Sequence, residues 1–218
     1  MEKRSKSQLF FAKKMKMKMI KLQGIPALQT KQQFLMMKKL FCSIFIVDLG
    51  NGKNLNSRMI YFKNDGTRFQ QEGTTTTNPC SSTTLKLSNQ NRYRFRIVLK
   101  SIPSTISAVR INDQQISYES QYQENNAELS FEMDMKQMNI DHNNHNHNGH
   151  RIRLTIHIDF SDYHHLNIDI QVKLYNQNDS HLTWGQIFRS MITEAELLTT
   201  TTMNEQNYII TRMNFLSI

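Results

Sequence analysis

Two neighbouring segments with strictly alternating side chains constrain the fold of this chain more than any other feature. Apolar side chains occupy every second position of residues 151–160 and again of residues 166–175. These positions are Ile152, Leu154, Ile156, Ile158 and Phe160, then Leu166, Ile168, Ile170, Val172 and Leu174. Successive side chains of a strand point to opposite faces, so each segment predicts a strand with one buried face. The polar residues 161–165 are few enough to connect antiparallel neighbours, which predicts a half-buried hairpin.

Short strand-like segments separated by turn residues occupy most of the chain from Leu40 onward. The clearest turn is Asn64-Asp65-Gly66, because Asp-Gly tolerates the positive φ of a tight hairpin. Further strands are predicted over residues 40–47, 58–63, 67–71, 83–87, 92–100, 106–111, 115–119, 127–134 and 208–215. Residues 192–198 could form a helical turn, which the threonines after them would end. Many short strands without a convincing long helix indicate an all-β domain, either an antiparallel β-sandwich or a flattened barrel.

The positive charge of the chain is concentrated at its beginning. The first 40 residues carry eleven Lys or Arg and one acid, hence +10, whereas residues 41–218 carry 16 basic and 17 acidic side chains, hence −1. A nucleic-acid-binding domain carries its positive patch on the fold itself, so this distribution argues against a nucleic-acid partner. We predict a basic, disordered extension over residues 1–37 and a β-sandwich domain over 38–218, with low-complexity loops near 73–82 and 141–150.

Cysteine content and hydropathy predict a cytoplasmic protein without a transmembrane segment. Cys42 and Cys80 are the only cysteines, one in an apolar run and one in a polar segment, which gives no disulfide framework. We expect Cys42 to be a small buried hydrophobe. No apolar run approaches the roughly 20 residues of a transmembrane helix. Residues 40–47 follow two lysines and imitate a secretory signal, but Asp48 ends the run without a small-residue cleavage site, so we interpret them as a strand.

Histidines and acids give two patterns that could carry metal chemistry. His142, His145, His147 and His150 alternate with Asn and Gly, and such tracts bind Zn²⁺ or Cu²⁺ loosely. A structural metal site needs fixed geometry, so we interpret this run as a low-complexity loop. His164-His165, with Asp159 and Asp162 nearby, is interpreted as part of a solvated turn. Nucleophile, phosphate-loop and zinc-protease motifs are absent from the sequence. We therefore predict no enzymatic activity, no cofactor and no metal.

Two groups of residues are candidates for binding a partner. Arg92, Arg94 and Arg96 fall on one face of a single predicted strand, where they could receive an acidic or phosphorylated peptide. The interpretation that we favour is an ordinary solvated face whose arginines meet acids across the strands. Trp184, the only tryptophan, lies beside Gly185 and could contact a ligand. A lone tryptophan of an all-β domain more often fills the core or closes one end of the sandwich, and we favour that interpretation of Trp184.

Three motifs carry a resemblance to a known family. Residues 171–176 (Gln-Val-Lys-Leu-Tyr-Asn), followed by Trp184-Gly185 and Phe188, resemble the late signature of the cannabinoid receptor-interacting protein family. Residues 61–69 (Tyr-Phe-Lys-Asn-Asp-Gly-Thr-Arg-Phe) resemble its first hairpin, and residues 103–105 (Pro-Ser-Thr) are similar to a third motif. The motifs occur in the family's order, and together the resemblance covers most of the chain from residue 40 to about residue 192.

The resemblance implies a fold and a function. The implied fold is similar to that of the guanine-nucleotide dissociation inhibitors of Rho GTPases. The implied function is that of a cytosolic accessory protein that binds the C-terminal tail of a G-protein-coupled receptor, the type 1 cannabinoid receptor in vertebrates, and modulates its signalling. From the chemistry of the side chains, and not from the resemblance, we assign partner binding to Arg92, Arg94, Arg96, Lys173, Tyr175, Trp184 and Phe188. The alternative function is a carrier of a lipid or lipidated cargo, held between the two sheets.

Overall fold

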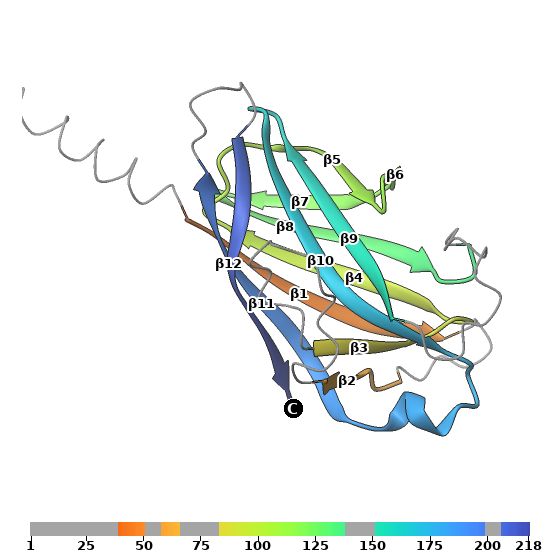
Figure 1. Ribbon diagram of the computed structural model, residues 1–218. Coiled ribbons are helices and arrows are strands. Elements are labelled where there is room, and N and C mark those ends of the chain that lie inside the picture. Colours follow the sequence, from red (N-terminus) through yellow and green to blue (C-terminus); the bar gives the residue numbers. More distant parts are fainter. Residues whose placement is uncertain (1–38, 51–57, 66–82, 138–150, 199–205) are drawn as a thin grey trace, which may run out of the picture. The chain divides into compact units, whose positions relative to one another are not determined.

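The computed structural model describes residues 39–50, 58–65, 83–137, 151–198 and 206–218. These residues form strands joined by turns, with one 3₁₀ turn, η2 (Ser180–Thr183), and no α-helix (Figure 1). The strands are β1 (Lys39–Gly50), β2 (Tyr61–Asn64), β3 (Thr83–Ser88), β4 (Arg92–Lys100), β5 (Ile106–Ile111), β6 (Gln114–Gln115), β7 (Glu119–Gln123), β8 (Asn126–Asp134), β9 (Arg151–Phe160), β10 (His164–Tyr175), β11 (Gln186–Leu198) and β12 (Gln206–Ser217). The all-β prediction is confirmed.

The strands pair into one continuous sheet that closes on itself through its last strand. The order is β6-β5-β9-β10-β3-β2-β11-β1-β4-β8-β7, and β12 pairs with both β10 and β11. Strands β10, β3, β2, β11 and β12 therefore form a closed circuit, as in a barrel, and further strands extend from it (Figure 1). The ladders are antiparallel as predicted, except that β10 pairs in parallel with β3 and with β12.

The hairpin predicted from the two alternating segments is present as β9 and β10. Ile156 pairs with Ile168 and Leu154 with Ile170, and all four side chains are buried. The connecting turn is shorter than predicted, because His164 and His165 already belong to β10 and only residues 161–163 lie outside the strands. The interpretation of these two histidines as part of a solvated turn is therefore wrong.

One hydrophobic core lies inside this sheet. The core contains the inward side chains of β4, which are Tyr93, Phe95, Ile97 and Leu99, together with the buried apolar side chains of β9 and β10. The ring of Phe95 stacks on that of Phe131 in β8 with centroids 5.2 Å apart. Cys42 is also buried, as expected, and burial raises the pKa of its thiol to about 12.

Two element predictions need correction. Residues 192–198 form no helical turn but complete β11, which pairs with β1 on residues 191–196 and with β12 along most of its length. Ladder hydrogen bonds and the burial of Met191, Thr193 and Ala195 override the helix preference of the Glu-Ala-Glu-Leu stretch. The single strand predicted over 115–119 is replaced by the two short strands β6 and β7.

Several predictions fall on residues that the structure does not describe. These are the extension over residues 1–37, the loops near 73–82 and 141–150, the strand over 67–71 and Cys80. Lys39–Ile218 belong to one compact unit. Within the described residues, no helix is long and apolar enough to span a membrane.

Candidate functional site

The three arginines of β4 lie on the outward face of the sheet and already have partners. Arg94 pairs with Glu132, which lies directly across on β8, through Nη2 at 2.6 Å from Oε1. Arg96 forms two hydrogen bonds with Glu128, of 2.6 and 2.7 Å. Arg92 lies 3.8 Å from Glu132. Hydrogen bonding to Glu128 raises the pKa of Arg96 and, in return, lowers that of the glutamate. Two carboxylates therefore balance most of the charge of this row.

Trp184 is held on the surface by the turn that joins β10 to β11. Asp179 caps the beginning of η2, and its Oδ1 accepts a hydrogen bond from the backbone N–H of His181 at 2.8 Å. The chain then leaves η2 at Trp184, whose side chain is 59% exposed. The next residue, Gly185, has φ +131°, and a Cβ there would lie 2.5 Å from the carbonyl oxygen of Phe62. Gly185 thus lets the backbone pass close to β2, while the ring of Trp184 points to solvent. The interpretation of Trp184 as a core residue is therefore wrong.

Three lysines from three strands surround this ring and that of Tyr175. Nζ of Lys63 lies 5.2 Å from the centroid of the Trp184 ring. Nζ of Lys86 lies 5.1 Å from the Trp184 ring and 5.5 Å from the Tyr175 ring. Nζ of Lys173 lies 4.9 Å from the Tyr175 ring. These distances are within the roughly 6 Å of a cation–π contact. We call these five residues, Lys63, Lys86, Lys173, Tyr175 and Trp184, the lysine–tryptophan surface.

Lys86 is the buried centre of this surface. Its Nζ donates to the carbonyl oxygen of His181 at 2.7 Å and to that of Trp184, so it fixes the η2 turn against β3. Burial lowers the pKa of Lys86, and the positive charges of Lys63 and Lys173 lower it further, against smaller opposing effects of Asp65 and Asp179. The three ammonium groups therefore repel one another. Lys63 forms an ion pair with Asp65, with Nζ 3.7 Å from Oδ1, whereas neither Lys86 nor Lys173 forms an ion pair among the described residues.

Two of the predicted binding residues are mostly buried. Tyr175 is 8% exposed, and its ring serves the surface as a wall against which Lys86 and Lys173 lie. Phe188 is 6% exposed and belongs to a cluster of rings in the core, 6.4 Å from the Phe62 ring and 6.0 Å from the Phe215 ring. The structure therefore brings Lys173, Tyr175 and Trp184 together, whereas Phe188 packs in the core on the strand that follows them.

Sequence reasoning did not select Lys63 or Lys86. Lys63 was visible inside the hairpin motif, since it stands one residue before Asn64-Asp65-Gly66. Lys86 gives no signal, because a lysine between Leu85 and Leu87 is typical of the outward position of an alternating strand, whereas its side chain is covered by the η2 turn.

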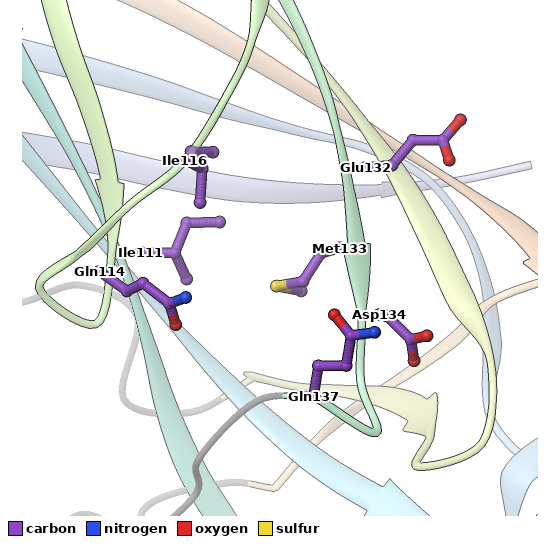
Figure 2. A pocket seen from close by; sticks show the side chains of 7 residues that line it. All are labelled: Ile111, Gln114, Ile116, Glu132, Met133, Asp134 and Gln137. Atoms are coloured by element: carbon purple, nitrogen blue, oxygen red, sulfur yellow. The ribbon is translucent and has the colours of Figure 1, made fainter.

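A small cavity lies elsewhere, between the end of β8 and the β5–β6 turn. Its volume is about 150 Å³. It is lined by the apolar residues Ile111, Ile116 and Met133 and by the polar residues Gln114, Glu132, Asp134 and Gln137. Figure 2 shows the two isoleucines across the cavity from Met133, while the carboxylate of Glu132 points away. Pockets that enclose most of a small ligand measure roughly 300–1,000 Å³, so this cavity is too small for a lipid chain.

Comparison with known proteins identifies one family. A family model described as "CB1 cannabinoid receptor-interacting protein 1" matches residues 43–209, which include all five residues of the lysine–tryptophan surface and all three arginines of β4. A comparison with curated proteins found no match.

Proposed function

The chain belongs to the CB1 cannabinoid receptor-interacting protein family, and we propose that it binds the C-terminal tail of a cannabinoid-type G-protein-coupled receptor through the lysine–tryptophan surface. In this role it is a non-enzymatic accessory protein of the cytoplasm that reaches the plasma membrane through its receptor and modulates signalling. The receptor-interacting character of the family is consistent with an accessory role.

One observation carries the choice of surface. Trp184 is a large exposed ring flanked by two ammonium groups, of which Lys63 lies 3.7 Å from Asp65 and Lys86 forms no ion pair among the described residues. Tryptophan with an adjacent cation is typical of binding hot spots, because the ring buries apolar area while the cation selects for negative charge. The arginines of β4 are less favourable for this purpose, because an incoming carboxylate would first have to displace Glu128 or Glu132.

The chemistry of the surface specifies the tail that it would take. An extended peptide with its terminal carboxylate or an acidic side chain near Lys63 and Lys173 would form charge-assisted hydrogen bonds. An apolar side chain of the same peptide would lie on the Trp184 ring. A bound negative charge would also reduce the repulsion among the three lysines. Binding would therefore gain both from direct hydrogen bonds to the peptide and from the loss of this repulsion.

The carrier alternative lacks such support. Inside the closed sheet, the inward side chains of β4, β9 and β10 are bulky and buried, and Phe95 of β4 stacks on Phe131 of β8. An acyl or prenyl chain would need space that these side chains fill. Co-purification of a lipid, detected by native mass spectrometry, would favour the carrier instead.

Calorimetric titration of the full chain with receptor C-terminal tail peptides tests the proposal. We expect one saturable site, weakened about 30-fold by Trp184→Ala, which corresponds to a hot spot of ~2 kcal/mol. Lys173→Glu should weaken binding about tenfold and reduce its salt dependence. Lys100→Glu, an exposed lysine at the end of β4, is the matched control and should leave the affinity unchanged.

The same titration decides the role of the arginines. With Arg92, Arg94 and Arg96 all changed to Ala, an unchanged Kd assigns binding to the lysine–tryptophan surface alone. A Kd that rises as much as in Trp184→Ala would extend the site to β4. Saturable binding that survives both Trp184→Ala and Lys173→Glu would contradict the proposal.

A further inference from the structure

A second group of chemically active side chains lies on the outward face of β9 and β10, and it is independent of the proposed function. His157 and Asp159 are two residues apart on β9 and therefore share a face. His165 on β10 stands directly across from Asp159 in the ladder. Regular pairing of two strands thus brings two imidazoles and one carboxylate to one point of the sheet.

The three side chains converge on a single oxygen atom. Nε2 of His157 lies 2.9 Å, and Nδ1 of His165 lies 2.6 Å, from Oδ1 of Asp159. One ligand atom from each residue lies within 4.8 Å of the other two. The imidazole rings are stacked, with centroids 5.8 Å apart and an angle of 28° between their planes. Asp159 is buried and the histidines are partly buried, so the side chains have limited freedom.

This spacing is close to that of a tetrahedral zinc site. Zn–N and Zn–O bonds of about 2.0–2.2 Å place neighbouring ligand atoms about 3.3 Å apart. The present separations around Oδ1 are a little shorter, so small rotations about the side-chain bonds would open the set around an ion. Two histidines and one carboxylate are the protein ligands of many zinc sites whose fourth position holds water.

Arg110 supplies the outer contact that such a site needs. It lies on β5, across from His157 in the ladder, and its Nη2 is 3.0 Å from Oδ1 and 2.9 Å from Oδ2 of Asp159. With Oδ1 on a metal, Arg110 would remain on Oδ2 and hold the carboxylate in place. Its charge offsets part of the carboxylate charge. The two imidazole nitrogens, and not this charge, favour Zn²⁺ over Mg²⁺ or Ca²⁺, which prefer oxygen ligands.

We propose that His157, Asp159 and His165 form a zinc site on the outward face of the β9–β10 hairpin, with one coordination position open to water. Without metal, the three side chains form the compact hydrogen-bonded cluster described above. The neighbouring His164 belongs to a separate pair, because its Nδ1 lies 2.9 Å from Oδ1 of Asp162 rather than in the cluster.

The test must first remove a competing group of histidines. His142, His145, His147 and His150 can bind metal loosely, so all four are changed to Asn in an otherwise complete chain, which serves as the reference. The reference is titrated with Zn²⁺ by calorimetry and with Co²⁺ by visible absorption. We expect one Zn²⁺ per chain and the intense d–d bands of tetrahedral cobalt.

Substitutions in the reference chain identify the ligands. His157→Ala and Asp159→Asn should each weaken zinc binding at least tenfold and abolish the cobalt bands, while His164→Asn, the matched control, should change neither. Near-UV circular dichroism shows whether each variant is folded. If His157→Ala does not fold, Asp159→Asn alone tests the ligand assignment. No stoichiometric zinc in the reference, or equal affinity in the folded reference and Asp159→Asn, would overturn the proposal.

Discussion

Gly185 has a backbone conformation that side-chain-bearing residues rarely adopt. Its φ is +131°, and a Cβ would lie 2.5 Å from the Phe62 carbonyl oxygen, which belongs to the backbone and cannot rotate away. We predict that Gly185→Ala lowers the free energy of unfolding by at least ~2 kcal/mol, because the energy cost of the strained φ adds to that of the steric clash with the backbone. Urea denaturation measures this loss. The exposed neighbour Gln186→Ala should stay within about 0.5 kcal/mol of the unchanged protein, and equal effects of the two changes would contradict the strain at Gly185.

Asp65 links the turn after β2 to β9 and makes stability depend on pH. Burial would raise the pKa of its carboxyl, but hydrogen bonds from Arg151 and Thr84 and the charges of Arg151 and Lys63 outweigh burial, so the pKa lies below its ordinary value. The carboxylate oxygen accepts from Nε of Arg151 at 3.0 Å. A carboxyl with a lowered pKa adds stability above the unfolded-state pKa of about 3.9, and this stability is lost as the pH falls through the folded pKa.

We therefore predict that Asp65→Asn costs about 2 kcal/mol at pH 7 and less at low pH. Urea midpoints at pH 7, 5 and 3 measure the difference between the two proteins, which should be constant from pH 7 to 5 and shrink by pH 3. Asp113→Asn is the matched control, since Asp113 is exposed and its φ of 67° suits asparagine equally well. A difference for Asp65→Asn that does not change with pH would contradict the assignment.

At the scale of the element, the β9–β10 hairpin is held by one buried face. Ile156 is fully buried, and an aspartate there would place an unpaired carboxylate in the core. We predict that Ile156→Asp abolishes the cooperative thermal transition measured by circular dichroism, whereas Ile156→Val at the same position costs only about 0.5–1.5 kcal/mol. A transition for Ile156→Asp near that of the unchanged protein would mean that the opposite face is inward.

The sequence was sufficient for elements whose pattern is local. Period-two alternation predicted β4, β9 and β10 because one face of each is buried and the other is not. It was not sufficient for β11, whose Glu-Ala-Glu-Leu stretch favours a helix in isolation and becomes a strand through pairing with β1 and β12. Pairing between β1 and β11, which are far apart in the sequence, leaves no local signal.

The same contrast applies to the sites. Lys173, Tyr175 and Trp184 were found from a motif, whereas Lys86 was hidden because its neighbours on β3 suggested an exposed position. The cluster of His157, Asp159 and His165 could be predicted from the sequence, because a hairpin with a three-residue turn places Asp159 directly across from His165. The prediction of a five-residue turn placed His165 outside the ladder and lost that register.

At the scale of the whole molecule, the lysine–tryptophan surface carries a local positive charge that suits an acidic partner. Residues 41–218 are nearly neutral overall, with 16 basic and 17 acidic side chains, and the arginines of β4 are paired with glutamates. The lysine–tryptophan surface departs from this balance, because three ammonium groups lie around two rings and only one of them, that of Lys63, forms an ion pair among the described residues, with Asp65. A local excess of charge on a nearly neutral domain gives selectivity and faster association without general attraction to polyanions.

The only tryptophan of the chain lies within this surface and reports on it directly. The decisive experiment follows the fluorescence of Trp184 while the full chain is titrated with the receptor C-terminal tail. If the tail binds at the lysine–tryptophan surface, emission changes saturably with the Kd found by calorimetry, and the change weakens as salt is added and is reduced in Lys173→Glu. Calorimetric binding of the same tail with no change in Trp184 emission would place the receptor site elsewhere on the protein.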